Sequence, residues 1–477
     1  MTDQAFCVHG HFYQPPREDP FTGEIPVEPG AAPYNNWNER IHDQCYRPNA
    51  ILGNFEHISF NLGPTLANWM KGYDPETHDR IIEQDAHNVA MYGVGNAMAQ
   101  AYNHTILPLS PRHDKETQVI WGMSDFENRF GRKPRGMWLP ETAMDIETLE
   151  VLAEYGIHFT ILAPWQADVE QPDVSQPYYV SLPGGKRIIV FLYHPELSSR
   201  VSFDPGSTEN ADTFVVQKIL PQFRGKATRD QRARMLIIAS DGELYGHHQP
   251  YREKFLARLM GSSLIGQNVH TTFPELWLKQ YPPEKEIRLK PRTSWSCHHG
   301  VLRWSGECAC SAHPEWKAPL RSALDKIATA LDEEFYKAVR PYLADPWQLR
   351  HNYIEVLTGK VDGAGYIKKV FGSRVTESEV NKLRLLLAAQ VERQRMFTSC
   401  GWFFDDFDRI EPRNNIAYAA QAVCFNFQAT GVDLSLDCAS WLSGVKSWRS
   451  GLQASVVFEH SYGRFQCGSG KWDYAMD

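Results

Sequence analysis

Short apolar runs rich in β-branched residues recur along the first half of the chain, and each ends in polar residues. Between several of them lie segments with helical spacing, such as 118–130 and 146–155, the second with Asp145 as an N-cap. The predicted strands are 5–9, 57–61, 136–139, 158–162, 187–193, 235–239 and 268–272. Strands that alternate with helices predict a parallel sheet.

The first predicted strand favours a barrel over an open sheet. Open sheets that bind nucleotides usually follow this strand with a glycine-rich phosphate loop. Here the strand runs into His9-Gly10-His11 and a proline-rich loop at 14–33. We therefore expect a closed or nearly closed β/α barrel.

After about residue 275 the pattern changes to helical spacing with few strand signals. Segments 315–343, 347–357 and 377–396 carry apolar residues at this spacing, and in the last of them they line one stripe. We expect a barrel over 1–275 and a helical domain over 276–429. The tail at 430–477 has no clear pattern.

Composition narrows the class of protein. The net charge is −8 and no long Lys/Arg run is present, which argues against a nucleic-acid partner. No signal peptide and no run of 18 apolar residues is visible, so we expect a cytoplasmic protein without a membrane partner. The 14 Trp and 20 Tyr residues modestly favour sugar binding. Oligomeric state cannot be read from these features.

The nine cysteines include one close pair, Cys308 and Cys310. A Cys-x-Cys pair can bind a metal or join a disulfide. Because no second pair at ligand spacing stands out, reduced and partly buried thiols are the preferred interpretation. The sequence thus predicts no metal and no cofactor.

Polar residues follow three predicted strands, where a parallel barrel carries its active site. His9 and His11 are two apart, so both imidazoles should face one side of the strand. Glu141 follows the strand at 136–139, although a glutamate there can also merely complement a helix dipole. Asp241 ends the strand at 235–239 and opens a loop with several titratable groups. This loop has the clearest active-site character.

Two further loops mix aromatic and polar residues without a regular period. They are 294–304, with Trp295 and His299, and 402–406, with Trp402 and Asp405. A binding loop and a helix junction packed by tryptophan fit both patterns equally well.

A pair of carboxyl groups is what glycoside cleavage requires. One protonates the leaving oxygen, and the other captures or stabilises the oxocarbenium-like centre. At about 5–5.5 Å apart the second attacks directly and configuration is retained. Glu141 and Asp241 can meet in this way across the barrel mouth, but sequence gives neither their distance nor their pKa values.

Four motifs in order resemble glycoside hydrolase family 57. The first is a His-rich strand end at 9–15, in which Phe12-Tyr13 separate His11 from Gln14-Pro15. The second is a Tyr-x-His-x-Ile-x-Pro-Leu pattern at 102–109 that contains His104. The third is Trp-Leu-Pro-Glu at 138–141, and the fourth is Asp-x-Glu-x-x-Gly-His at 241–247. Segments 57–69, 294–303 and 400–406 are similar to a branch of this family that carries a domain of unknown function, DUF3536.

This resemblance implies an incomplete (β/α)7 barrel followed by a helical domain, and a retaining hydrolase or transglycosylase acting on α-linked glucan. It also implies Glu141 as nucleophile and Asp241 as acid/base. Expected substrate-binding residues are His9, His11, His104, Trp138, Glu243, His247, Trp295, His299, Trp402 and Asp405.

Two alternatives remain open at this stage. His9, His11, Asp241 and His247 offer ligands for a divalent metal, as in an α-mannosidase or a polysaccharide deacetylase on a related barrel. A non-catalytic glycan-binding protein would use the aromatic loops alone. A deacetylase needs no carboxylate at the position of Glu141, which argues against the metal enzyme. The presence of both Glu141 and Asp241 argues against the binding protein.

Overall fold

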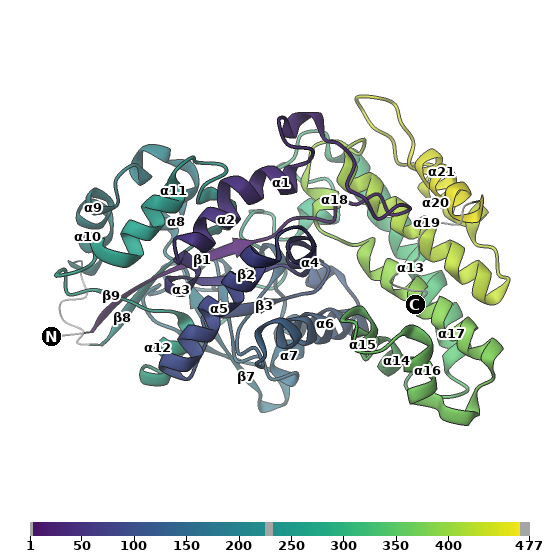
Figure 1. Ribbon diagram of the computed structural model, residues 1–477, viewed down its shortest axis with the longest axis horizontal. Helices are drawn as coiled ribbons and strands as arrows, with labels where there is room; N and C mark the ends of the chain where they lie inside the picture. Colours follow the sequence, from purple (N-terminus) through teal and green to yellow (C-terminus); the bar gives the residue numbers. More distant parts are fainter. Residues whose placement is uncertain (1–2, 225–231, 468–477) are drawn as a thin grey trace. The chain divides into compact units, whose positions relative to one another are not determined.

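A computed structural model describes residues 3–224 and 232–467 of the chain (Figure 1). Contacts divide the chain into two compact units. The first contains Met1–Gln14, Val27–Ala101 and Phe126–Trp295. The second contains Pro15–Pro26, Tyr102–Asp125 and Ser296–Asp477. The division thus falls after Trp295, and two early segments belong to the second unit.

The first unit is a barrel of parallel strands. Strand β1 lies between β2 and β8, and the path continues from β2 through β3 to β4. A parallel bridge between Gly136 and Phe159 leads on to β5, which pairs with β7. The His194 amide, just after β7, donates to the Ile237 carbonyl of β8 at 2.7 Å. The strands are β1 Gln4–Phe12, β2 Ser59–Leu62, β3 Ala97–Gln100, β4 Met137–Trp138, β5 Phe159–Leu162, β7 Arg187–Leu192 and β8 Arg234–Asp241.

Three short strands lie outside this path. Strand β6 (Tyr178–Ser181) is antiparallel to β7, β9 (His270–Thr271) pairs with β1, and β10 (Lys285–Glu286) pairs with β6. The predicted barrel is confirmed. The sequence patterns did not predict strands β3, β6 and β10. The sequence Ala-Met-Ala-Gln of β3 has little β preference of its own.

Helices connect the strands, and local sequence sets their ends. Asp145 caps α7, as predicted, by accepting a hydrogen bond from the Thr148 amide at 2.8 Å. The helices from the barrel half of the chain are α1 Trp37–Ile41, α2 Arg47–Ile51, α3 Asn54–His57, α4 Pro64–Tyr73, α5 Pro75–Tyr92, α6 Arg112–Phe130, α7 Ile146–Glu154, α8 Pro195–Phe203, α9 Ala211–Phe214, α10 Leu220–Arg224, α11 Arg252–Arg258 and α12 Pro274–Gln280.

The second unit is helical, as expected. The apolar stripe of α17 is buried in a cluster with Trp121, Phe335 and Tyr353. The stretch after residue 430, which had no predicted structure, forms α20 and α21, and α21 packs on α19. The helices are α13 Lys317–Val339, α14 Trp347–His351, α15 Ile354–Leu357, α16 Gly363–Phe371, α17 Glu377–Arg395, α18 Cys400–Phe403, α19 Ile410–Thr430, α20 Ser435–Leu442 and α21 Ala454–Cys467. Residues 468–477 of the predicted tail lie outside the described part.

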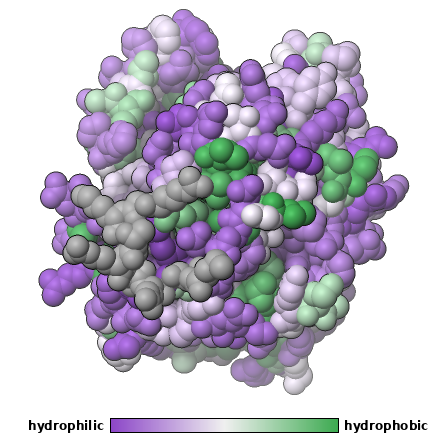
Figure 2. Space-filling view, turned by 90° about the vertical axis from the view of Figure 1, so that its left-hand side faces the viewer, coloured by the Kyte–Doolittle hydropathy of each residue, from purple (hydrophilic) through white to green (hydrophobic). Residues whose placement is uncertain are grey.

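The surface in Figure 2 is mostly polar, as expected when the apolar residues are buried in the core. On this face, hydrophilic residues predominate and hydrophobic ones form small separate patches. Among the described residues, no helix combines the length and the apolar character needed to cross a bilayer.

Candidate active site

Glu141 lies in a tight turn after β4, at the C-terminal end of the strand. Its backbone is left-handed, with φ 57° and ψ 21°, which is costly for a residue other than glycine. Trp295 makes two hydrogen bonds to this turn. Its backbone amide donates to the Glu141 carbonyl at 3.0 Å, and its Nε1 donates to Glu141 Oε2 at 3.0 Å. The carboxylate therefore has a fixed orientation.

Asp241 ends β8 and is the register partner of His11 on β1. Burial of its carboxyl group, together with the negative charges of Glu243 and Glu141, raises the pKa of Asp241 to about 8. The residue as a whole is exposed, so the carboxyl group combines close protein surroundings with access to solvent. At neutral pH it is mostly protonated. Glu141 and Asp241 thus act on each other electrostatically within one site.

Glu243 lies inside the protein two residues further on. Its Oε1 accepts hydrogen bonds from the Tyr46 hydroxyl at 2.7 Å and from the Tyr13 amide at 3.2 Å. Burial raises the pKa of Glu243 to about 7, although these hydrogen bonds oppose the rise. Above neutral pH it therefore places a negative charge beside Asp241.

His9 and His11 stack on Trp138, with ring centroids 4.6 and 5.3 Å away. Asn61 on β2 lies between them, 3.3 Å from His9 Nε2 and 3.2 Å from His11 Nδ1 through its Oδ1. Burial lowers the pKa of His9 to about 3 and that of His11 to about 4, so both rings are neutral. His9 is fully buried and can influence a ligand only through its neighbours.

Two further aromatic rings of the barrel unit, those of Trp295 and Tyr193, follow on from Trp138. Trp138 meets Trp295 edge-on at 5.1 Å, and Trp295 meets Tyr193 edge-on at 6.3 Å. Trp138 is fully buried, whereas Trp295 is half-buried. Of these two predicted binding residues, Trp295 is thus the one with a ring accessible to a ligand.

His247 lies in the turn after Glu243, where Gly246 has a positive φ of 138°. Its Nδ1 is 2.7 Å from Gln44 Oε1, and its ring meets Trp37 edge-on at 5.9 Å. Burial and the neighbouring His248 lower the pKa of His247 to about 4. The ring is therefore neutral and engaged with residues 37–44.

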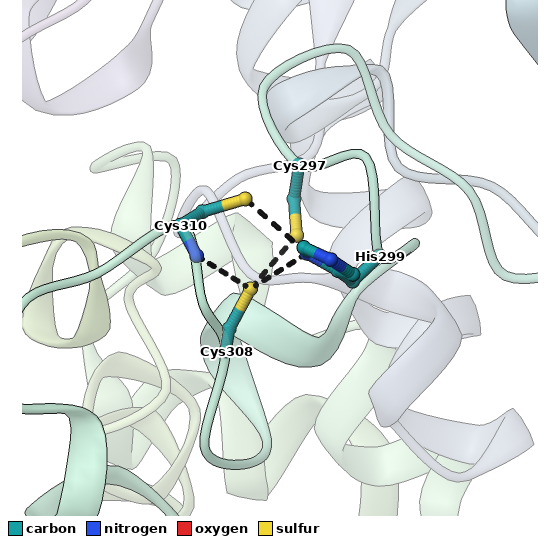
Figure 3. A group of neighbouring side chains, drawn as sticks. All are labelled: Cys297, His299, Cys308 and Cys310. Carbon is teal, nitrogen blue, oxygen red and sulfur yellow. Dashed lines mark hydrogen bonds between the residues drawn. The ribbon is translucent and has the colours of Figure 1, made fainter.

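The other predicted binding residues belong to the second unit. His104 is buried with its Nδ1 2.7 Å from Ser399 Oγ. Trp402 is also buried, and its Nε1 donates to the Lys317 carbonyl, so its ring offers no open face for a sugar. Asp405 is exposed. His299 lies among three cysteines (Figure 3).

The predicted metal-ligand set does not converge. Within residues 3–224 and 232–467, the group of His, Cys, Asp and Glu side chains close enough to hold an ion is Cys297, His299, Cys308 and Cys310. His9, His11, Asp241 and His247 form no such group. Conversely, Cys297-x-His299 is a second pair beside Cys308 and Cys310, which the interpretation as isolated thiols overlooked.

Sequence patterns also missed two polar residues of the barrel, Asn61 and Tyr46. Asn61 also donates to Gln100 Oε1 at 2.7 Å, which joins β1, β2 and β3 by side chains. The single amide of Asn61 near the end of an apolar strand is the sequence signal that indicates this bridging role. Tyr46 carries no local signal, because its partner Glu243 is 197 residues away.

Comparison with known proteins identifies the family. The family model for glycosyl hydrolase family 57 matches residues 34–290, more than half of the chain, and the chain belongs to this family. A second model, for a domain of unknown function (DUF3536), matches residues 313–460. That match reaches well into the stretch after residue 430.

Curated relatives are distant. Alpha-amylase 1 of Dictyoglomus thermophilum is 21% identical over 320 residues, which are 64% of this chain and 42% of that protein. A 4-alpha-glucanotransferase of Thermococcus litoralis is 23% identical over 263 residues, 53% of this chain and 37% of that protein. The chain thus spans less than half the length of these relatives.

Solved structures of similar fold cover nearly the whole chain. An exo-type maltose-forming amylase from Pyrococcus sp. ST04 gives a TM-score of 0.72 at 14% identity, covering 96% of this chain and 88% of that one. A branching enzyme of Pyrococcus horikoshii gives 0.62 at 15% identity, with 95% and 96% covered. At such identities the likeness shows the fold alone.

Proposed function

We propose that the chain is a retaining glycoside hydrolase or transglycosylase that acts on α-linked glucan, with Glu141 as nucleophile and Asp241 as acid/base. The observation that carries this proposal is the contrast between the two carboxyl groups. One is oriented by the Trp295 indole, and the other has a pKa raised to about 8. Two carboxyl groups whose surroundings separate their roles are typical of acid/base assignment in such enzymes.

In the first step, Asp241 donates its proton to the glycosidic oxygen as the bond to the anomeric carbon breaks. Glu141 attacks this carbon from the opposite face and forms a covalent glycosyl-enzyme. The Trp295 hydrogen bond holds Glu141 Oε2, so little reorganisation is needed for attack.

In the second step, Asp241 is ionised and takes a proton from the incoming hydroxyl group. That oxygen attacks the anomeric carbon and releases Glu141, and two inversions give net retention. Water as acceptor gives hydrolysis, and a sugar hydroxyl gives transfer. The half-buried Trp295 ring supports a role in holding a sugar beside Glu141.

The neutral imidazole of His11 suits hydrogen bonding to sugar hydroxyls. We assign His9 and Trp138 to supporting this ring, because both are fully buried and stacked in the same group. The names of the matched relatives, alpha-amylase and 4-alpha-glucanotransferase, favour α-glucan as the substrate class. His104, His299, Trp402 and Asp405 have no assigned part in this mechanism.

Product analysis with maltoheptaose tests the proposal. Chromatography that resolves chain length should show shorter products for a hydrolase, and both shorter and longer ones for a transferase. An unchanged maltoheptaose peak would contradict the assignment to α-1,4-linked glucan.

The matched control is Glu141→Gln, which keeps the shape of the side chain and removes the nucleophile. Turnover should fall by about four orders of magnitude while substrate binding persists. Azide should restore turnover in Glu141→Ala as a glycosyl azide. Full activity in Glu141→Gln would refute the mechanism.

A cytoplasmic location is also part of the proposal. Cys7, Cys45, Cys424 and Cys438 are buried thiols outside any disulfide, which is typical of a reducing compartment. Fractionation of the native cells, with a known cytoplasmic enzyme as marker, tests this location.

A further inference from the structure

Four metal-ligating side chains converge in a loop at the start of the last segment of the second unit, which begins at Ser296 (Figure 3). They come from two short pairs, Cys297-x-His299 and Cys308-x-Cys310, separated by a single short helix at Leu302–Trp304. The three Sγ atoms and a ring nitrogen of His299 all lie within 4.8 Å of one another. This loop lies between the two matched family segments, which end at 290 and begin at 313.

The spacing of these atoms fits one tetrahedral ion. Zn–S bonds of about 2.3 Å and Zn–N bonds of about 2.0 Å place neighbouring ligand atoms about 3.5–3.8 Å apart. Cys297 Sγ lies 3.4 Å from Cys308 Sγ. His299 Nδ1 lies 3.4 Å from Cys308 Sγ and 3.3 Å from Cys310 Sγ. Small outward shifts would bring all four atoms to bonding distance of a common centre.

The surroundings suit thiolates. Burial of Cys297 and Cys308 by itself disfavours thiolates, but the Cys310 amide donates to Cys308 Sγ at 3.4 Å, and a bound cation would offset the cost of burial. Buried Lys317, the first residue of α13, interacts electrostatically with Cys297 and Cys308. Three thiolates and a neutral imidazole around Zn²⁺ carry a net charge of −1, which the lysine ammonium balances.

A disulfide or a sugar contact would account for fewer of these four residues. A disulfide between Cys297 and Cys308 would leave His299 and Cys310 without a reason to converge. A substrate-binding role for His299, which the sequence suggested, does not account for three cysteines around its ring. Soft sulfur ligands with one imidazole select zinc over magnesium or calcium.

We propose that Cys297, His299, Cys308 and Cys310 bind one zinc ion in a structural site. The protein supplies all four ligands, and no position remains for a substrate or a reactive water. The ion ties the two ends of the 297–310 loop together, beside the start of α13, where Lys317 Nζ donates to Ser311 Oγ at 2.7 Å. This site is independent of the proposed glycosidase chemistry.

Metal analysis of the purified chain tests this proposal. After expression with added zinc and gel filtration in a reducing buffer, elemental analysis should find about one zinc per chain. X-ray absorption should show three sulfur ligands at about 2.3 Å and one nitrogen at about 2.0 Å. The paired variant Cys308→Ser/Cys310→Ser should retain less than a tenth of the zinc, while Cys400→Ser, outside the cluster, should retain all of it.

A second measurement does not depend on the folding of the paired variant. Removing zinc from the unmodified chain with a chelator should speed proteolytic cleavage within 297–310, and added zinc should restore protection. Less than a tenth of an equivalent of zinc in the reconstituted chain would overturn the proposal. So would iron as the bound metal, a Cys297–Cys308 disulfide in the reduced preparation, or full zinc retention in the paired variant.

Discussion

At the scale of single residues, the site depends on how three carboxyl groups share one end of the barrel. Glu141 is oriented by an indole, Glu243 is buried under Tyr46 and Tyr13, and Asp241 lies at the end of β8 near both charges. Crowded like charges cannot all ionise at neutral pH. Burial of its carboxyl group, together with these charges, raises the pKa of Asp241, so Asp241 keeps its proton, which is the state that the proposed first step requires.

Replacing Glu243 with Gln should move the alkaline limb of the pH profile of kcat/KM to lower pH. The proposed acid must be protonated, so activity is lost as pH rises through the pKa of Asp241, about 8. Removing the Glu243 charge eases ionisation of Asp241 and lowers this pKa, by roughly one unit for one close charge. Initial rates between pH 5 and 10 measure the shift. Glu275→Gln, a barrel carboxyl group that faces Arg132, is the control, and an unmoved limb in Glu243→Gln would contradict the charge coupling.

Replacing Trp295 with Phe should lower kcat by roughly 10- to 100-fold. The change keeps a ring but removes the N–H that holds Glu141 Oε2, and a hydrogen bond to a charged group is worth about 1.5–3 kcal/mol. Steady-state kinetics on a maltooligosaccharide measure it. Trp165→Phe is a matched control, because the Trp165 indole donates to the Ser294 carbonyl instead. Equal kcat in both variants would argue against a positioning role for Trp295.

At the scale of elements, parallel pairing gathers the site. The register sets His11 beside Asn61 of β2 and beside Asp241 of β8, and Gln100 of β3 beside Trp138 of β4. Each of these residues stands at the carboxyl end of its strand. Because the strands are short and buried, small changes in the turns that follow them should lower the stability of the barrel.

The turn after β8 offers a direct test in Gly246→Ala. A Cβ there would lie 2.2 Å from the backbone oxygen of Gln44, at a φ of 138° that side chains rarely adopt. Strain of about 2–3 kcal/mol should lower the midpoint of thermal unfolding by roughly 5 °C or more. Gly72→Ala is the control, since its Cβ meets nothing within 4 Å in helix α4 and should leave the midpoint unchanged or slightly raised. Equal midpoints in both variants would contradict the close approach.

At the scale of the whole molecule, different interactions stabilise the two units. The barrel has a core of apolar strand residues around Trp138 and Trp277. The helical unit adds a buried ion network, in which Asp114 accepts from Arg350 at 2.8 Å and from Arg393, and Arg393 also donates to Asp332 at 2.7 Å. This network ties the early segment 102–125 to α13, α14 and α17.

Asp114→Asn should destabilise the helical unit by about 3–5 kcal/mol, because buried Arg350 and Arg393 lose a counter-charge. Burial opposes ionisation of Asp114, but the charges of Arg393 and Arg350 hold its pKa below the ordinary value. Its stabilising contribution is thus present above about pH 4, the unfolded value, and is lost as pH falls further. Unfolding midpoints from pH 3 to 7 should show a shallower acid slope in the variant. Glu377→Gln, which breaks the exposed pair with Lys368, should change little at any pH.

Much of the barrel followed from local pattern. Apolar runs located most strands, Asp145 marked the start of α7, and the stripe on α17 identified its buried face. Strand β3 was missed because alanine, methionine and glutamine take the extended form here through pairing with β2 and β4 rather than through their own preference. Segments 15–26 and 102–125 also belong to the helical unit. No local sequence pattern indicates this assignment.

The sequence by itself determined the family and the barrel and predicted the two carboxyl groups, because strand periodicity and short motifs act over a few neighbouring residues. Only the tertiary structure decided which side chains meet. It buried Trp402, set Glu243 beside Asp241 under Tyr46, and brought Cys297 and His299 to Cys308 and Cys310. Burial, pKa and metal geometry depend on groups that are distant along the chain, and their contacts exist only once the chain has folded.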